Sequence, residues 1–226
     1  MKALILAAGM ASRLRPLTAN TPKCLLKIGE RCLLQRSIDA LIASGIDELV
    51  IVTGFLREKI ESFVVSHYPN LKVTFIFNEV FDSTNNIYSL WLARKEVEGC
   101  DTLLLDSDLL YDPEIIKRIL AEKSPNILTL IKHPLGEEEI KVIVDDKGSI
   151  VELNKTCNPA DAIGESLGIE RMGVDYTTAL YNELDGMMNH EHLENVFYEV
   201  AFERLAKQGH CFSVLDVTDL FSCELD

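Results

Sequence analysis

The sequence predicts a single α/β domain with a mixed, mainly parallel sheet flanked by helices on both faces. Segments of strand length alternate with segments of helical spacing from the first residues onward. Several of the strand segments are apolar along their whole length, which is typical of strands buried on both faces of a sheet. The 226 residues, of which 47% are hydrophobic, can bury one large core. No repeat, low-complexity tract or linker divides the chain, so we expect a single domain over residues 1–226.

The first half of the chain shows the alternation most clearly. Leu34, Ile38 and Leu41 recur at helical spacing, and Gly45 supplies a stop signal after them. Asn85, or the threonine before it, is suited to cap a later helix. The expected elements are strands at 3–6, 48–53, 72–77 and 102–105, a short apolar segment at 25–28, and helices at 33–44, 58–66 and 85–95.

The second half changes character, because a β-hairpin interrupts the alternation. Its two apolar arms flank a turn at 145–148. We expect this hairpin to add a small β region to a Rossmann-like sheet. The remaining expected elements are a helix at 112–120, a strand at 126–131, hairpin strands at 141–144 and 150–153, an apolar patch at 167–169, helices at 177–187 and 195–207, and a strand at 211–215.

Composition excludes several classes of protein. The formal net charge of −14 argues against binding to long nucleic acids, but not against a small anion in a cleft lined by cations. No apolar run reaches the ~20 residues that span a bilayer, and the first cations follow the opening apolar run, unlike those of a signal peptide. The six cysteines lack metal or redox spacing. We therefore expect a cytoplasmic protein with reduced thiols, without nucleic-acid partners or membrane insertion. The sequence leaves the oligomeric state open, a homodimer included.

The opening stretch, residues 1–23, carries the clearest functional signal. An apolar strand segment runs into the small residues Ala7-Ala8-Gly9, which would let a ligand lie against the backbone N–H groups. Arg13, Arg15 and Lys23 follow and suit a polyphosphate. The stretch contains neither a Walker loop nor a Gly-x-Gly-x-x-Gly loop. It therefore predicts a nucleotide-phosphate site of another kind.

Two aspartates follow the strand expected at 102–105. Ligands of parallel sheets sit at the carboxyl ends of strands, so Asp106 and Asp108 should share a crevice with the opening loop. Asp108 would then be a ligand of Mg²⁺, which favours one or two carboxylates completed by phosphate oxygens and water. Ordinary solvated loop acids are an equally open interpretation of the pair taken alone.

The sequence indicates no nucleophilic triad. The five histidines lie mostly in polar contexts that favour surface positions. An attacking phosphate is already anionic at neutral pH and needs no base. Catalysis would then depend on alignment and on charge neutralisation by Mg²⁺, Arg and Lys.

Residues 6–23 resemble the signature of the nucleotidyltransferases that make nucleoside-diphosphate sugars and alcohols, and the resemblance covers nearly the whole chain. It implies that Arg13 binds the β- and γ-phosphates and that Lys23 neutralises the α-phosphate. The metal ligands that it implies are Asp108 and Asp226. Family members continue beyond that second aspartate, so this chain is trimmed there or is one domain of a longer protein. The implied nucleotide-binding residues are Leu6, Ala7, Ala8, Gly9, Asn85 and Ser107.

Other segments resemble the branch of this family that uses CTP. Ser107-Asp108-Leu109 replaces the Gly-Asp-Asn of the sugar-nucleotide synthases, and residues 85–90, 139–142 and 164–169 resemble enzymes acting on phosphocholine, 2-aminoethylphosphonate or inositol phosphate. Acidic residues at 82, 106 and 165 would suit an ammonium head group, supplemented by a cation–π contact. A core role for the aromatic residue of 85–90, and solvated hairpin charges for the two lysines, are the alternatives. The implied acceptor-binding residues are Lys155, Lys141, Glu165 and Tyr88.

The implied reaction is the Mg²⁺-dependent transfer of a cytidylyl group from CTP to a phosphorylated small alcohol or a phosphonate, of the phosphocholine or 2-aminoethylphosphonate type, with release of pyrophosphate. Two alternatives stay open. The protein could be a sugar-1-phosphate nucleotidyltransferase that uses UTP, GTP or dTTP, or a catalytically silent nucleotide-binding regulatory subunit.

Overall fold

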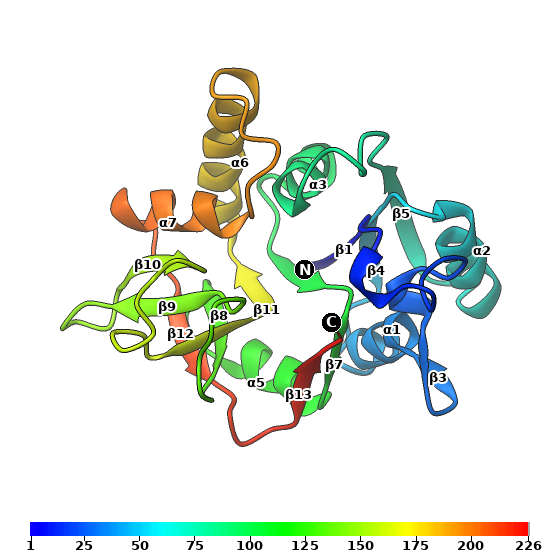
Figure 1. Ribbon diagram of the computed structural model, residues 1–226, viewed down its shortest axis with the longest axis horizontal. Helices are drawn as coiled ribbons and strands as arrows, with labels where there is room; N and C mark the ends of the chain where they lie inside the picture. The colour runs from blue at the N-terminus through cyan, green and yellow to red at the C-terminus, as the bar shows by residue number, and fades with distance from the viewer. Residues whose placement is uncertain (226) are drawn as a thin grey trace.

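The computed structural model describes residues 1–225 and has a nine-stranded mixed sheet at its centre (Figure 1). Its path runs β10-β9-β11-β6-β1-β4-β5, with β8 paired to β11 and β12 paired to β8. The first half of the chain forms the parallel part, in which β1 lies between β4 and β6. The parallel strands are β1 (Lys2–Ala7), β4 (Glu48–Thr53), β5 (Lys72–Phe77) and β6 (Thr102–Asp106).

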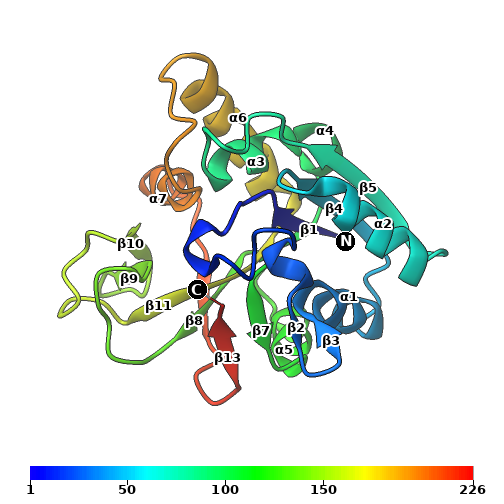
Figure 2. The same cartoon turned by 45° about the vertical axis from the view of Figure 1, so that its right-hand side comes forward.

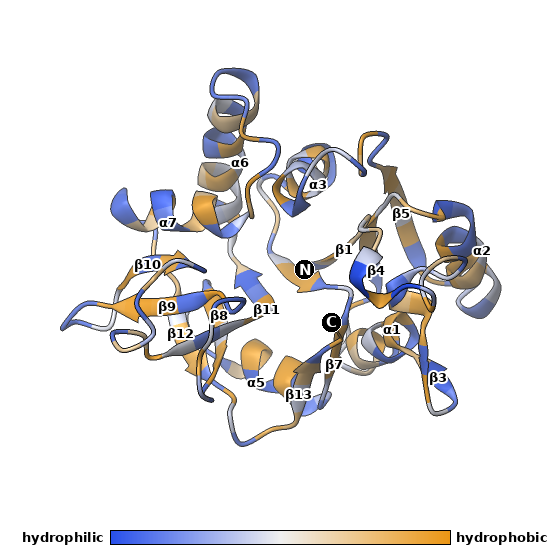
Figure 3. Ribbon diagram, in the orientation of Figure 1, coloured by the Kyte–Doolittle hydropathy of each residue, from blue (hydrophilic) through white to orange (hydrophobic). Residues whose placement is uncertain are grey.

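Helices cover both faces of the sheet, as the fully apolar strands predict. Leu4 and Leu6 of β1 face a core shared with α3, α6 and α7, whereas Ala3 and Ile5 face a second core shared with α1, α2 and α5. Much of the central strands consists of hydrophobic residues, whereas many of the outer turns consist of hydrophilic residues (Figure 3). No helix among residues 1–225 is long and apolar enough to cross a membrane. The helices are α1 (Leu33–Ala43), α2 (Arg57–His67), α3 (Asn86–Leu92), α4 (Arg94–Val97), α5 (Glu114–Ala121), α6 (Val174–Asn189) and α7 (Glu199–Lys207).

The second half of the chain adds an antiparallel part around one long strand. β11 (Gly164–Met172) pairs antiparallel with β6, β8 and β9, so it joins the two parts of the sheet. The sequence predicted only an apolar patch at 167–169, because charged residues at both ends of the strand hide its length. The other strands of this part are β8 (Ile127–Ile131), β9 (Lys141–Val144), β10 (Ile150–Asn154) and β12 (Ser213–Asp216).

Two small sheets were not predicted, because their strands are too short to show a pattern. The first, β2 (Lys27–Ile28) with β3 (Arg31–Cys32), is a hairpin before α1. The second consists of β7 (Leu109–Tyr111), which follows β6 in the chain, and β13 (Ser222–Glu224), which pairs antiparallel with it. This pairing brings the end of the described chain back beside β7 (Figure 2), and β7 follows directly on β6 in the chain.

Several predicted helices differ from the structure at their ends; the helix expected at 177–187, for example, spans Val174–Asn189. The helix expected at 85–95 is divided at Ala93 into α3 and α4, and Asn85 caps it by accepting a hydrogen bond from the N–H of Asn86. The helix expected at 195–207 begins only at Glu199. The preceding segment is anchored to α3 instead, because the N–H of Tyr198 donates to the Asn86 side chain at 3.0 Å.

The loop after β1 is held against the loop after β4 at Gly54. The N–H of Phe55 donates to the carbonyl of Ala8 at 3.1 Å, and a Cβ at Gly54 would lie 2.5 Å from that carbonyl and 2.7 Å from the Cβ of Phe81. We expect Gly54→Ala to lower the free energy of unfolding by about 1–3 kcal/mol, because neither contact can be relieved without moving backbone. Urea denaturation would measure this change. In the control Gly186→Ala, the new Cβ in α6 meets no described atom within 4 Å. Equal midpoints for the two variants would contradict the prediction.

Candidate active site

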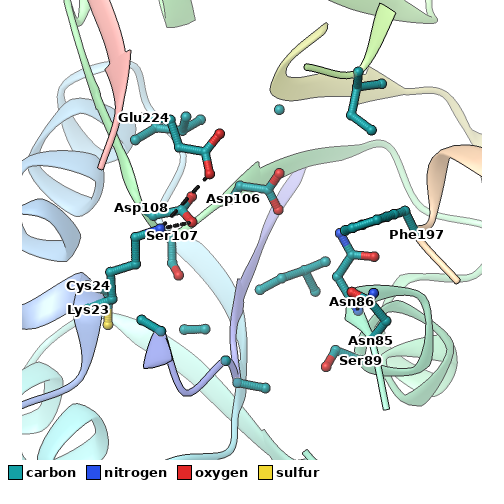
Figure 4. Close-up of a pocket in the computed structure, with 18 of the residues that line it drawn as sticks. Lys23, Cys24, Asn85, Asn86, Ser89, Asp106, Ser107, Asp108, Phe197 and Glu224 are labelled. Atoms are coloured by element: carbon teal, nitrogen blue, oxygen red, sulfur yellow. Dashed lines mark hydrogen bonds and ion pairs between the residues drawn. The ribbon is translucent and has the colours of Figure 1, made fainter. Parts of the chain in front are cut away.

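A cavity of about 380 Å³ opens at the carboxyl ends of β1 and β6 (Figure 4). The loop after β1, the turn after β6, the start of α3, part of β11 and the segment before α7 contribute to its walls. The structure thus brings the opening loop and the two aspartates after β6 together, as the sequence predicted from the direction of the strands.

Lys23 lines this cavity and pairs there with two carboxylates. Its Nζ is 3.0 Å from Oδ2 of Asp108 and 3.9 Å from Oε1 of Glu224 (Figure 4). Lys23 begins a short 3₁₀ helix, Lys23–Leu25, and its side chain is 14% exposed. Glu224 was missed in the sequence, because its place depends on the pairing of β13 with β7. The N–H of Leu225 fixes this strand further by donating to the carbonyl of Asp108 at 3.0 Å.

The small-residue loop forms the wall beside Lys23. Leu6, Ala7, Ala8 and Gly9 all line the cavity, and a Cβ at Gly9 would meet no described atom within 4 Å. The loop therefore leaves space for a ligand against its backbone. Across the cavity, Asn85 lines the wall at the start of α3. Ser107, between the two aspartates, also lines it.

Glu138 links two cations at the mouth of the cavity. Its Oε2 lies 3.6 Å from Nη1 of Arg13 in the opening loop and 3.2 Å from Nζ of Lys155, which follows β10. Both cations line the cavity. Their side chains come from opposite halves of the chain, so the structure gathers a set of positive groups that a polyphosphate and a second phosphate could share.

The structure does not bring all of the expected acceptor residues to the cavity. Glu165 lines the cavity, whereas Tyr88 and Lys141 do not. The Glu165 carboxylate accepts a hydrogen bond from Nε2 of His133 at 2.6 Å. Tyr88 packs on the core with its ring 5.3 Å from that of Trp91, so a cation–π contact with an acceptor is not available to it here.

Lys141 is buried rather than solvated. Its Nζ donates to the carbonyls of Lys155 at 2.7 Å and of Glu139 at 3.2 Å. Since these bonds hold the backbone of Lys155, Lys141 supports the cavity wall instead of reaching into it. The pattern of alternating residues on a hairpin could not reveal this, because it does not show which carbonyls lie opposite a lysine.

Three carboxyl groups lie behind and beside the cavity wall. Burial raises the pKa of Glu170 well above its usual range, and it does the same to Asp106 with help from the charge of Asp108. Tyr198 donates its hydroxyl to Asp106 at 3.0 Å. Gly168, with φ +81°, allows β11 to approach closely, because a Cβ there would lie 2.7 Å from Oδ2 of Asp106. The third group, Glu199, begins α7 and lines the cavity.

The stability of the protein should depend on the protonation of Glu199. Burial raises the pKa of this carboxyl from 4.5 to about 7. Its contribution is therefore fully present below about pH 4.5 and is lost as the pH rises through about 7. We expect Glu199→Gln to gain stability relative to the unmodified protein over this range, by up to about 3 kcal/mol. The urea unfolding free energies of the two proteins, compared at pH 5 and pH 8, report the loss of the Glu199 charge together with its effect on the nearby Asp106 and Glu170 carboxyl groups. A difference that does not change with pH would refute this assignment.

The carboxylates around Lys23 fit a magnesium ion. Within residues 1–225, no group of three or more His, Cys, Asp or Glu side chains could hold a metal alone. Mg²⁺, however, needs only one or two carboxylates when phosphate oxygens and water complete its shell. Asp108 and Glu224 both supply hard oxygen donors near the Lys23 ammonium group. The expected ligand Asp226 lies outside the described residues.

Comparisons with known proteins point in the same direction. A family model described as MobA-like NTP transferase domain matches residues 3–146. The CTP:phosphoglutamine cytidylyltransferase of Campylobacter jejuni is 24% identical over 252 residues, covering 100% of this chain and 96% of that protein. The choline-phosphate cytidylyltransferase of Streptococcus pneumoniae is 37% identical over 108 residues, or 48% of this chain and 44% of that protein. The inositol-1-phosphate CTP transferase of T. maritima has the same fold, with a TM-score of 0.81, 19% identity and coverage of 100% and 89%.

Proposed function

Because the chain belongs to the MobA-like NTP transferase family and is a nucleotidyltransferase, we propose that it transfers a cytidylyl group from CTP to a phosphorylated small alcohol or a phosphonate. The observation that carries this proposal is the meeting of Lys23, Asp108 and Glu224 beside the small-residue loop in one cavity. The choice of CTP follows the relatives from Campylobacter jejuni and Streptococcus pneumoniae, whose names give cytidylyl transfer as their activity.

In the proposed reaction, an anionic oxygen of the acceptor's phosphoryl group attacks the α-phosphorus of CTP. The new P–O bond forms as the bond from the α-phosphorus to the oxygen that bridges it to the β-phosphorus breaks, and pyrophosphate leaves with the electron pair. No proton has to be removed from the nucleophile, which agrees with a cavity that has no histidine among its described lining residues.

The chain's own residues would bind, align and neutralise. The backbone of residues 6–9 would hold the nucleotide, with Asn85 and Ser107 completing its site. Lys23 would offset the negative charge that develops at the α-phosphate, and Arg13 would bind the phosphates that leave. Lys155 would position the acceptor's phosphoryl group.

Asp108 and Glu224 would hold Mg²⁺, joined by Asp226 from outside the described residues. Bound there, the ion would neutralise phosphate charge and stabilise the departing pyrophosphate. The same carboxylates keep the Lys23 ammonium group in place.

Pyrophosphate release measured with CTP, UTP, GTP and dTTP tests the proposal, each nucleotide being paired with phosphocholine, 2-aminoethylphosphonate, inositol 1-phosphate and glucose 1-phosphate. We expect release with CTP that requires one of the first three acceptors. Release only with another nucleotide and glucose 1-phosphate would make the protein a sugar-1-phosphate nucleotidyltransferase. Binding of nucleotide without release in any pair would leave a silent binding subunit.

A further inference from the structure

Glu199 is a buried carboxyl group that the proposed reaction does not use. Its side chain lines the cavity and the residue is only 5% exposed. Its Oε2 has no hydrogen-bond partner among the described residues. A carboxyl oxygen that is removed from water without a partner carries a desolvation cost, so such a group calls for an explanation.

The surroundings of Glu199 add further carboxyl groups to this part of the wall. Asp106 lines the same cavity, and Glu170 lies behind it, fully buried with its own Oε2 unpartnered among residues 1–225. The cation whose charge acts on the Glu199 carboxyl group is Lys155. Its Nζ pairs with Glu138 at 3.2 Å and lies 4.8 Å from the centre of the Phe197 ring. No described Lys, Arg or His nitrogen lies within 4 Å of the Glu199 carboxylate.

The cavity wall therefore carries groups of both signs. Lys155 and Lys23 supply positive groups for phosphates, whereas Glu199 supplies a carboxyl group whose Oε2 has no hydrogen-bond partner among the described residues. A small acceptor with both a phosphoryl group and a positive charge would satisfy the lysines and this carboxyl group together. A neutral acceptor would leave Oε2 of Glu199 buried without a partner, unless the acceptor carried a hydroxyl group that could donate to it.

We infer that Glu199 binds a positively charged group of the acceptor and so selects acceptors that carry an ammonium group near the phosphorus. This inference rests on the proposed transfer to a phosphoryl acceptor, and it names the class of acceptor. Glu199 is then a specificity-determining residue, while Lys155 holds the other end of the same molecule.

Phosphocholine and 3,3-dimethylbutyl phosphate test this inference, because the second replaces the charged nitrogen by carbon at almost the same size. In the unmodified protein we expect kcat/KM with CTP to favour phosphocholine by about tenfold or more, the effect of one charge-assisted contact. Phosphoethanolamine and ethyl phosphate form a second pair, for an enzyme whose site accepts only a primary ammonium group.

Glu199→Gln keeps the size of the side chain and removes its charge. We expect the preference for the charged member of the pair to fall to within about threefold, with turnover of the neutral member retained. Glu183→Gln in α6, outside the cavity lining, serves as the matched control and should keep the preference.

The outcomes separate this inference from the proposed function. If neither member of either pair releases pyrophosphate from CTP while inositol 1-phosphate does, the inference fails and the transfer stands. If the neutral members react as well as the charged ones in the unmodified protein, the inference also fails, whether or not the variant folds. A preference that survives in Glu199→Gln would assign the charge recognition to another residue. No release with any phosphoryl acceptor would instead overturn the proposed function.

Discussion

Replacement of Lys23 by alanine should lower kcat by about 10²-fold or more, because a preformed positive charge at the reacting phosphate is lost. The side chain lines the cavity and pairs there with Asp108 and Glu224, and it lies beside the loop proposed to hold the nucleotide. Its contribution should appear mainly in kcat, since the charge that it offsets grows in the transition state. Steady-state pyrophosphate release with saturating CTP and acceptor gives the measurement.

Lys27→Ala is the matched control for this variant. Lys27 belongs to the same basic segment but is exposed on β2, and it does not line the cavity. It should turn over at the unmodified rate, and both variants should unfold cooperatively. If Lys23→Ala retained kcat within about threefold of the control, the role assigned to Lys23 at the α-phosphate would be wrong.

Asp108→Asn should have an effect of similar size, about 10²-fold or more on kcat, and it should also raise the Mg²⁺ concentration needed for half-maximal rate. The amide keeps the shape of the side chain but loses the charge that suits both Mg²⁺ and the Lys23 ammonium group. A titration of rate against Mg²⁺ at fixed CTP separates the two effects.

Asp146→Asn provides the comparison, because Asp146 is an exposed aspartate in the turn between β9 and β10. Its rate and its Mg²⁺ dependence should match those of the unmodified protein. An Asp108→Asn enzyme with the same Mg²⁺ dependence as this control would remove Asp108 from the metal site.

The sequence predicted the parallel part of the fold closely, and the physical reason is the strength of its pattern. β4 and β5 have the bounds expected for them, since each is an apolar run ended by a clear polar or glycine boundary. The prediction of a mere apolar patch at 167–169 was too short, because the charged residues of β11 have their partners in distant parts of the chain and show no strand pattern in the sequence. Short strands such as β13 carry no periodicity, so their position depends wholly on tertiary pairing.

The candidate site could be predicted in its nucleotide part and less well in its acceptor part. The loop at 6–9 and Lys23 belong to one short stretch of the sequence, and its small and basic residues indicate phosphate binding directly. Glu199 and Glu224, by contrast, reach the cavity only through the packing of α7 and the pairing of β13. A glutamate at the start of an amphipathic helix gives no sign in the sequence that it will be buried.

The most direct test of the proposed transfer is phosphorus NMR of the complete reaction with CTP, Mg²⁺ and a charged acceptor such as phosphocholine. The mechanism predicts a new product with two coupled phosphorus signals, from a P–O–P link between the cytidylyl group and the acceptor, together with an equal amount of pyrophosphate. Formation of CMP and pyrophosphate without any acceptor signal, or of CDP and phosphate, would show attack by water or at another phosphorus, and would contradict the transfer.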